Sequence, residues 1–145
     1  SFEQRYLDNT HITFWQVDER TDAGVPDGWG VNGSWTRFID ERWLPFIRGG
    51  YSNDGGALLE RSVSVGVGHY MSRRSDLFGA GLNWGKPSSD FGSGLSDQYT
   101  AEVFYRLQFS ENFAITPDLQ WVLDPALAPT EDQLLIVGLR ARLSI

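Results

Sequence analysis

The segment that most constrains the fold is the C-terminal one, Asp132–Ile145, which reads DQLLIVGLRARLSI. Its residues alternate with a period of two, as in a β-strand whose two faces meet different surroundings. The opposite face carries Arg140 and Arg142. The uniformly apolar face consists of Leu135, Val137, Leu139, Ala141, Leu143 and Ile145. The alternation continues to the final residue, so we predict a strand that ends with the chain.

Similar alternating runs of about ten residues recur upstream, and each ends at a break rich in Gly, Pro, Asp or Asn. Helical periodicity is nearly absent, so the sequence predicts an all-β chain of about eight strands. The upstream strands are predicted at His11–Asp18, Trp29–Phe38, Trp43–Tyr51, Arg61–Met71, Leu77–Gly85, Gln98–Phe109 and Phe113–Leu123.

The breaks between these runs alternate in length. The short breaks are Ile39–Arg42, Ser72–Asp76 and Ser110–Asn112, and the long ones are Glu19–Gly28, Ser52–Glu60, Lys86–Asp97 and Asp124–Glu131. Short turns at one end and long loops at the other are typical of an antiparallel up-and-down transmembrane β-barrel, with the short turns periplasmic and the long loops extracellular. We therefore interpret residues 1–145 as a single transmembrane β-barrel domain.

Composition excludes several other classes of protein. The net charge is −7 with no basic run, which argues against a nucleic-acid binder. The chain has no cysteine, and its two histidines, His11 and His69, are far apart, so we expect no metal site and no cofactor. A mean hydropathy of −0.31 is compatible with a membrane barrel, because polar inward residues offset apolar outward ones.

Aromatic residues on the apolar face are sorted to the strand ends, with aliphatic residues between them. A soluble β-sandwich would also alternate, but it gives no reason for this sorting, whereas two aromatic girdles are expected at membrane interfaces. The long-loop end carries Trp29, Tyr51, Trp84, Tyr99 and Trp121, and the short-turn end carries Trp43, Phe78, Phe109 and Phe113. The faces of His11–Asp18 remain open: either Ile12 and Phe14, or Thr13, Trp15 and Val17, face outward.

The other face carries charged and amide side chains in mid-strand positions, where a dry core would disfavour them. A polar lumen accommodates them, and we predict that they line it. These candidates are Arg48, Glu102, Arg106, Asp118, Gln120, Arg140 and Arg142. Pro117 lacks an N–H, so we expect a bulge or irregularity in its strand.

Several segments resemble the carbohydrate-selective porins of the OprB-like family, and the resemblance runs from about Trp29 onward. It is carried by Phe46–Gly55, Ser75–Ser88, E-x-F-Y-R at Glu102–Arg106, T-P-D-x-Q at Thr116–Gln120, D-P-A at Asp124–Ala126 and G-L-R at Gly138–Arg140. It implies a barrel of about sixteen strands in the Gram-negative outer membrane, of which this chain resembles the C-terminal half. Such barrels usually end in an aromatic residue, and this chain ends in Ile145.

The resemblance implies passive diffusion of small sugars, and no bond-making chemistry. The chain has no G-x-S-x-G motif, so we do not expect an enzyme. The seven lumen candidates could hydrogen-bond sugars, or they could pair with one another. In the second case Arg140 and Arg142 would lie beside Asp118 and Gln120, or beside the partner of the first strand across the seam. We expect the inward rings of Phe46 and Phe104 to pack against the wall. The alternative function is a small eight-stranded structural barrel without a pore.

The expected partners are small sugars and the lipids of the outer membrane, including lipopolysaccharide, with a monomer or homotrimer as the assembly. The predicted long loops hold many carboxylates, which divalent cations could bridge to lipopolysaccharide phosphates. These are Asp18, Glu19, Asp22, Asp27, Asp54, Asp90, Asp97, Asp124, Glu131 and Asp132.

Overall fold

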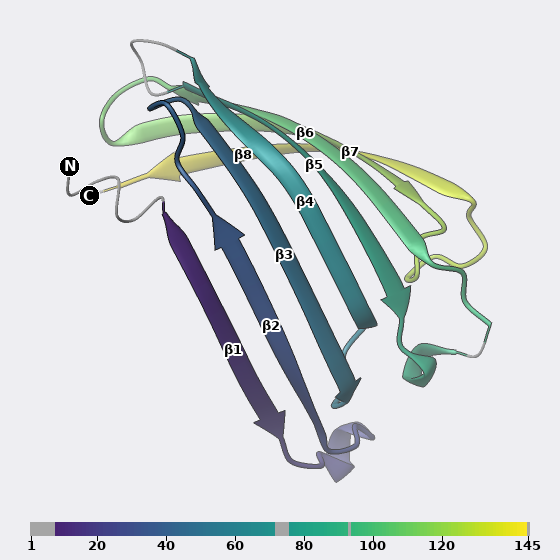
Figure 1. The fold of residues 1–145 in the computed structure, drawn as a ribbon. Helices are drawn as coiled ribbons and strands as arrows, with labels where there is room; N and C mark the ends of the chain where they lie inside the picture. The colour runs from purple at the N-terminus through teal and green to yellow at the C-terminus, as the bar shows by residue number, and fades with distance from the viewer. Residues whose placement is uncertain (1–7, 72–75, 93, 145) are drawn as a thin grey trace.

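The computed structural model describes residues 8–71, 76–92 and 94–144, which form one antiparallel sheet (Figure 1). Each strand pairs with its neighbours in sequence, in the order β1 to β8. The strands are β1 (Asn9–Val17), β2 (Gly28–Thr36), β3 (Trp43–Asp54), β4 (Leu59–Met71), β5 (Asp76–Pro87), β6 (Gln98–Gln108), β7 (Phe113–Leu123) and β8 (Gln133–Leu143). The all-β, up-and-down prediction is confirmed. Over the described residues, β1 and β8 are not paired with each other, and the sheet is open.

Helical structure in this part of the chain is confined to two single turns in loops, η1 (Thr21–Ala23) and η2 (Ser89–Phe91). Within the described ranges, no helix is long and apolar enough to cross a membrane.

Three of the connections match the predicted long loops, at residues 18–27, 88–97 and 124–132. The predicted long loop Ser52–Glu60 is wrong, because β3 extends to Asp54 and β4 begins at Leu59. Asp54, Gly55 and Gly56 have φ angles of 55°, 72° and 74°, and these left-handed conformations reverse the chain tightly. The predicted turn Ser72–Asp76 lies outside the described residues except for Asp76, and Ile145 also lies outside them.

The register between β1 and β2 resolves the open choice for the first strand. Phe14 pairs with Val31 and Ile12 with Gly33, so Ile12 and Phe14 lie on the apolar face. Trp15 pairs with Gly30 on the opposite face, and its ring occupies the space that a side chain at Gly30 would need. A glycine is therefore required beneath the indole.

Pro117 interrupts the β6–β7 ladder without shifting it. Paired positions run from Tyr99↔Leu123 to Phe104↔Asp118 and resume at Leu107↔Ile115 in the same register. The expected irregularity is therefore a gap in hydrogen bonding, because proline has no N–H to donate, and the expected bulge is absent from this ladder.

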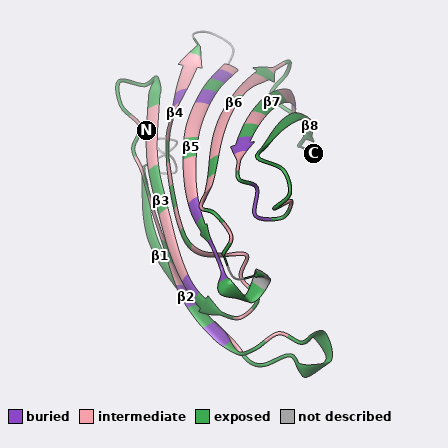
Figure 2. Cartoon of the chain, turned by 90° about the vertical axis from the view of Figure 1, so that its right-hand side faces the viewer, coloured by how far each residue is buried: buried purple, intermediate pink, exposed green. Residues whose placement is uncertain are grey.

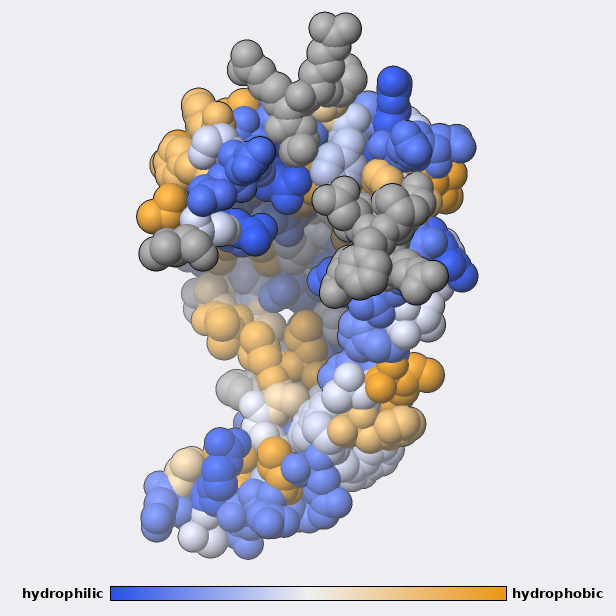
Figure 3. Space-filling model, turned by 90° about the vertical axis from the view of Figure 1, so that its left-hand side faces the viewer, coloured by the Kyte–Doolittle hydropathy of each residue, from blue (hydrophilic) through white to orange (hydrophobic). Residues whose placement is uncertain are grey.

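The sheet is curved (Figure 2), and the face that carries Arg48 and Arg106 borders the hollows on one side of it. We call this the inner face and the apolar face the outer face. Outer side chains are solvent-exposed: Leu82 is 62% exposed and Val137 77%. The buried apolar residues among those described are limited to Leu77, Ala114, Val122 and Ala126, so no second layer covers the outer face. Figure 3 shows hydrophilic residues gathered both in the upper part of the view and at its lower end, with hydrophobic residues between them.

Candidate functional site

A row of polar side chains crosses six neighbouring strands on the inner face. Each member pairs in register with the next, in the order His11, Ser34, Arg48, Ser64, Asn83 and Thr100. Because paired residues in neighbouring strands lie side by side, the row forms a continuous polar band across six strands of the wall. We call it the polar row.

Two hydrogen-bond groups fix side chains in and next to the polar row. The Ser34 hydroxyl lies 3.2 Å from His11 Nδ1. Asn83 Nδ2 donates to Ser64 Oγ at 2.9 Å and to Ser62 Oγ at 3.1 Å. A hollow of about 390 Å³ lies over this part of the face, lined among others by Arg48. Hydroxyl, amide and guanidinium groups therefore line an open, water-accessible surface.

The other predicted lumen residues form a second group on β6, β7 and β8. Glu102 pairs in register with Gln120, whose amide donates to the Asp118 carboxylate at 3.3 Å. Arg106 and Arg142 line a hollow of about 460 Å³ near the short-turn end. The structure therefore places all seven candidates on the inner face, with Arg48 apart from the other six.

Of the two placements expected for Arg140 and Arg142, the one beside Asp118 and Gln120 is wrong. Arg140 pairs with Thr116 and Arg142 with Ala114, because the hairpin register sets these arginines closer to the short-turn end. Asp118 instead lies opposite Gly138, and its carboxylate covers that glycine. Between described residues, no ion pair joins two of the seven candidates.

Inward aromatic rings lie flat against glycines of neighbouring strands. The Phe104 ring covers Gly79, its register partner on β5. The Phe46 ring covers Gly66 on β4 and reaches Gly81 on β5. The prediction that both rings pack on the wall is confirmed, because the glycines leave room for the rings to lie against the sheet.

The predicted girdle aromatics lie on the outer face, and two indole groups mark the polar side of the long-loop girdle. Trp84 Nε1 donates to Asp97 Oδ2 at 2.9 Å, and Trp121 Nε1 donates to Gln133 Oε1 at 3.1 Å. At the short-turn end the Trp43 ring lies 4.3 Å from that of His69, centroid to centroid. Rings with an apolar body and a polar edge directed to the loops suit a membrane interface.

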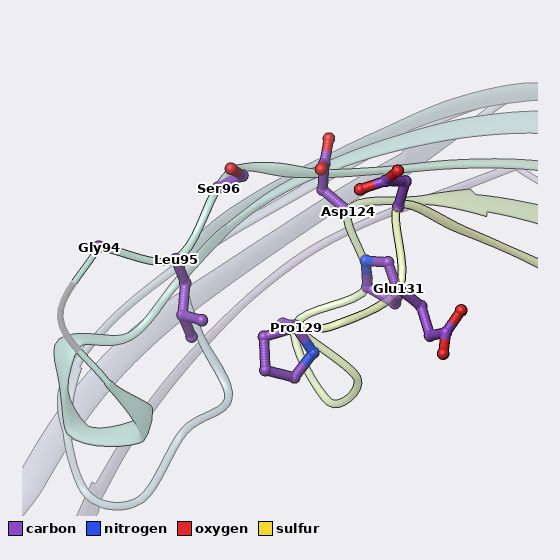
Figure 4. A pocket seen from close by; sticks show the side chains of 9 residues that line it. Gly94, Leu95, Ser96, Asp124, Pro129 and Glu131 are labelled. Atoms are coloured by element: carbon purple, nitrogen blue, oxygen red, sulfur yellow. The ribbon is translucent and has the colours of Figure 1, made fainter.

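The acidic loop residues do not converge on a common point. Asp124, Glu131 and Asp132 line a small hollow between the β5–β6 and β7–β8 loops, and Figure 4 shows Asp124 and Glu131 pointing away from each other. The two loops are docked, since Gln98 Oε1 accepts a hydrogen bond of 3.0 Å from the Ala126 amide. No group of three potential ligands in the described ranges could hold a metal ion.

The polar row contains residues that sequence reasoning did not select, namely His11, Ser34, Ser64, Asn83 and Thr100. The inward orientation of the last four follows from alternation along each strand, whereas that of His11 follows from the β1–β2 register. Their alignment in one row depends on the register between strands, which alternation alone does not fix.

The family comparison agrees with this two-faced sheet. The model of the carbohydrate-selective porin family, OprB, matches residues 4–144. The chain belongs to this family. OprB porins are channel proteins of the bacterial outer membrane rather than enzymes, so both the β-barrel and the carbohydrate-transport expectations are supported. Searches of curated proteins and of solved structures found no significant match.

Proposed function

We propose that this OprB-family chain lets small carbohydrates diffuse passively across the Gram-negative outer membrane, along the inner face of its sheet. The observation that carries the proposal is the polar row on the inside of a curved sheet whose outer face is apolar and exposed. Such a sheet can be lipid-facing outside and water-facing inside.

The chemistry of the inner face suits a permeating sugar. A sugar entering a channel exchanges bonds to water for bonds to the wall, and each bond must be weak enough to release it. Ser64 and Asn83 present neutral donors and acceptors, while Arg48 adds a charged donor in the same row. The second group, on β6–β8, offers carboxylate, amide and guanidinium groups nearer the short-turn end.

We further propose that the eight strands are half of a sixteen-stranded barrel and together make one domain. The strand order leaves β1 and β8 at opposite edges of the sheet, each with one side that is not paired in the described structure. An unpaired edge is strongly disfavoured within a bilayer, so both edges require partner strands. This barrel would be a monomer or homotrimer, and the carboxylate-rich long loops would bind lipopolysaccharide through divalent cations.

Single-channel recording in planar lipid bilayers, on the barrel that this chain forms together with its partner strands, tests this proposal. We expect stepwise conductance that glucose or maltooligosaccharides reduce, with weaker block in Arg48→Gln. A folded, heat-modifiable protein with almost no conductance would favour the alternative, a narrow eight-stranded barrel filled by side chains. A chain that stays folded and soluble without detergent would contradict the membrane placement.

A further inference from the structure

Two basic side chains lie on the outer face of the sheet, at the long-loop end. Arg61 on β4 and Lys86 on β5 pair in register. Within the described strands, the Arg and Lys side chains on this face are Arg61 and Lys86. The arginines of β3, β6 and β8 face inward: Arg48, for example, pairs with Ser64, and Arg140 pairs with Thr116. An otherwise apolar outer face therefore carries one localised positive patch.

A β-bulge builds this patch. The β4–β5 register shifts between Leu59 and Arg61, which redirects the intervening Glu60. Glu60 Oε1 accepts a bond of 3.1 Å from Arg61 Nε, and Oε2 lies 3.2 Å from Lys86 Nζ. One carboxylate thus spans both cations, and a phosphate group of similar size could do the same.

The patch keeps a positive charge and stays accessible. The side chains of Arg61 and Lys86 are 55% and 46% exposed, whereas Glu60 is 26% exposed. Two cations share one carboxylate, and Arg61 has further guanidinium N–H groups besides Nε. An anion arriving from the outer side can therefore bind without displacing Glu60.

Aromatic residues place the patch at the depth of lipid headgroups. Lys86 lies two residues beyond Trp84 on β5, about 7 Å closer to the loops. The Trp84 indole bonds to Asp97 in the long loop, so polar surroundings begin at this level. The Arg61 guanidinium lies 5.8 Å from the Tyr51 ring centroid, close enough for a cation–π contact that holds it beside the girdle.

We propose that Arg61 and Lys86 form a binding site for the phosphate groups of lipopolysaccharide. The site rests on the proposed membrane orientation, in which the long loops face outward and the adjoining leaflet consists of lipopolysaccharide. Basic clusters at headgroup depth bind anionic lipids by charge complementarity. This contact is direct, and it is separate from any cation bridge to the loop carboxylates.

Native mass spectrometry of the folded chain in detergent, titrated with bisphosphorylated lipid A, tests the site. We expect Arg61→Gln/Lys86→Gln to weaken binding about tenfold and Lys86→Gln alone to weaken it less. Glu60→Gln should bind a few-fold more tightly, because it removes a negative charge that lies next to both cations and repels the phosphate. Arg37→Gln is the matched control, since Arg37 lies at the short-turn end and is 52% exposed.

Unchanged lipid A binding in the double variant would overturn the site, even if the channel conducts. Equal affinity for phosphatidylglycerol would overturn the assignment to lipopolysaccharide. Failure of the wild-type chain to insert into lipid, scored by heat-modifiable gel mobility, would overturn both this site and the proposed function. If each variant keeps its heat-modifiable gel mobility, its loss of lipid A binding is not caused by a loss of folding.

Discussion

The contact between Gly79 and the Phe104 ring supports a matched pair of substitutions on β5. Gly79 and Gly81 lie two residues apart on the same inner face, and both occupy regular strand positions. A methyl group at Gly79 would overlap three atoms of the Phe104 ring. At Gly81 the nearest atoms would be Val65 O at 3.4 Å and Phe46 Cζ at 3.5 Å, which is ordinary packing distance. The same substitution therefore meets two different surroundings.

The expected difference in unfolding free energy between the two variants is about 1.4 to 4 kcal/mol. Gly79→Ala forces the Phe104 ring off the wall, and overpacking of this kind costs about 1–3 kcal/mol. Gly81→Ala introduces no overlap and restricts the unfolded chain, which stabilises by about 0.4–1 kcal/mol. The displaced Phe104 ring would also project into the enclosed space, so single-channel conductance should fall in Gly79→Ala alone.

Urea unfolding in lipid vesicles, followed by tryptophan fluorescence, measures both effects. The decisive comparison is Gly79→Ala in wild-type and Phe104→Ala backgrounds, where we expect a coupling of at least about 1 kcal/mol. Equal destabilisation in the two backgrounds would show that the ring does not occupy this space. Equal stability of Gly79→Ala and Gly81→Ala would refute the packing argument as a whole.

Three further experiments test other parts of the wall. Trp84→Phe keeps an aromatic ring but removes the hydrogen bond to Asp97, so the free energy of unfolding in vesicles should fall by about 1 kcal/mol. An unchanged value would mean that the hydrogen bond does not form. Leu139→Arg on β8 should lower the free energy of unfolding by about 2–4 kcal/mol, and Leu143→Arg, near the strand end, by at most about 1 kcal/mol. Identical losses in the two variants would contradict a lipid-facing β8. Asn83→Ala should weaken the block of single-channel current by glucose about three- to tenfold. An undiminished block would show that the polar row does not contact the permeating sugar.

The sequence predicts the faces of the sheet because alternation is a property of one strand at a time. Leu135 and Arg140 could be assigned to opposite sides without knowing what lies beside them. The register between strands depends instead on where each turn closes. A register shift of two residues keeps the faces but gives every residue a different cross-strand neighbour. This is why Arg140 was predicted on the correct face and yet beside the wrong residue of β7.

Local backbone irregularities were also beyond the sequence pattern. The glycines and polar residues between β3 and β4 suggest a long connection, but left-handed conformations from Asp54 to Gly56 make it short. The bulge before Arg61 moves Glu60 beside two cations, although strict alternation would place it inward. Both features arise from single residues leaving the regular strand geometry, and periodicity averages over such residues.

The pairs formed by an inward ring and a facing glycine also restrict how the chain can change over generations. In the pairs Gly30 with Trp15 and Gly79 with Phe104, the order in which the two residues are substituted matters. The ring can shrink first and leave a small gap, after which the glycine can gain a side chain. The reverse order passes through an overlapping intermediate, so substitutions at the two positions should be correlated among descendants and should begin at the aromatic position.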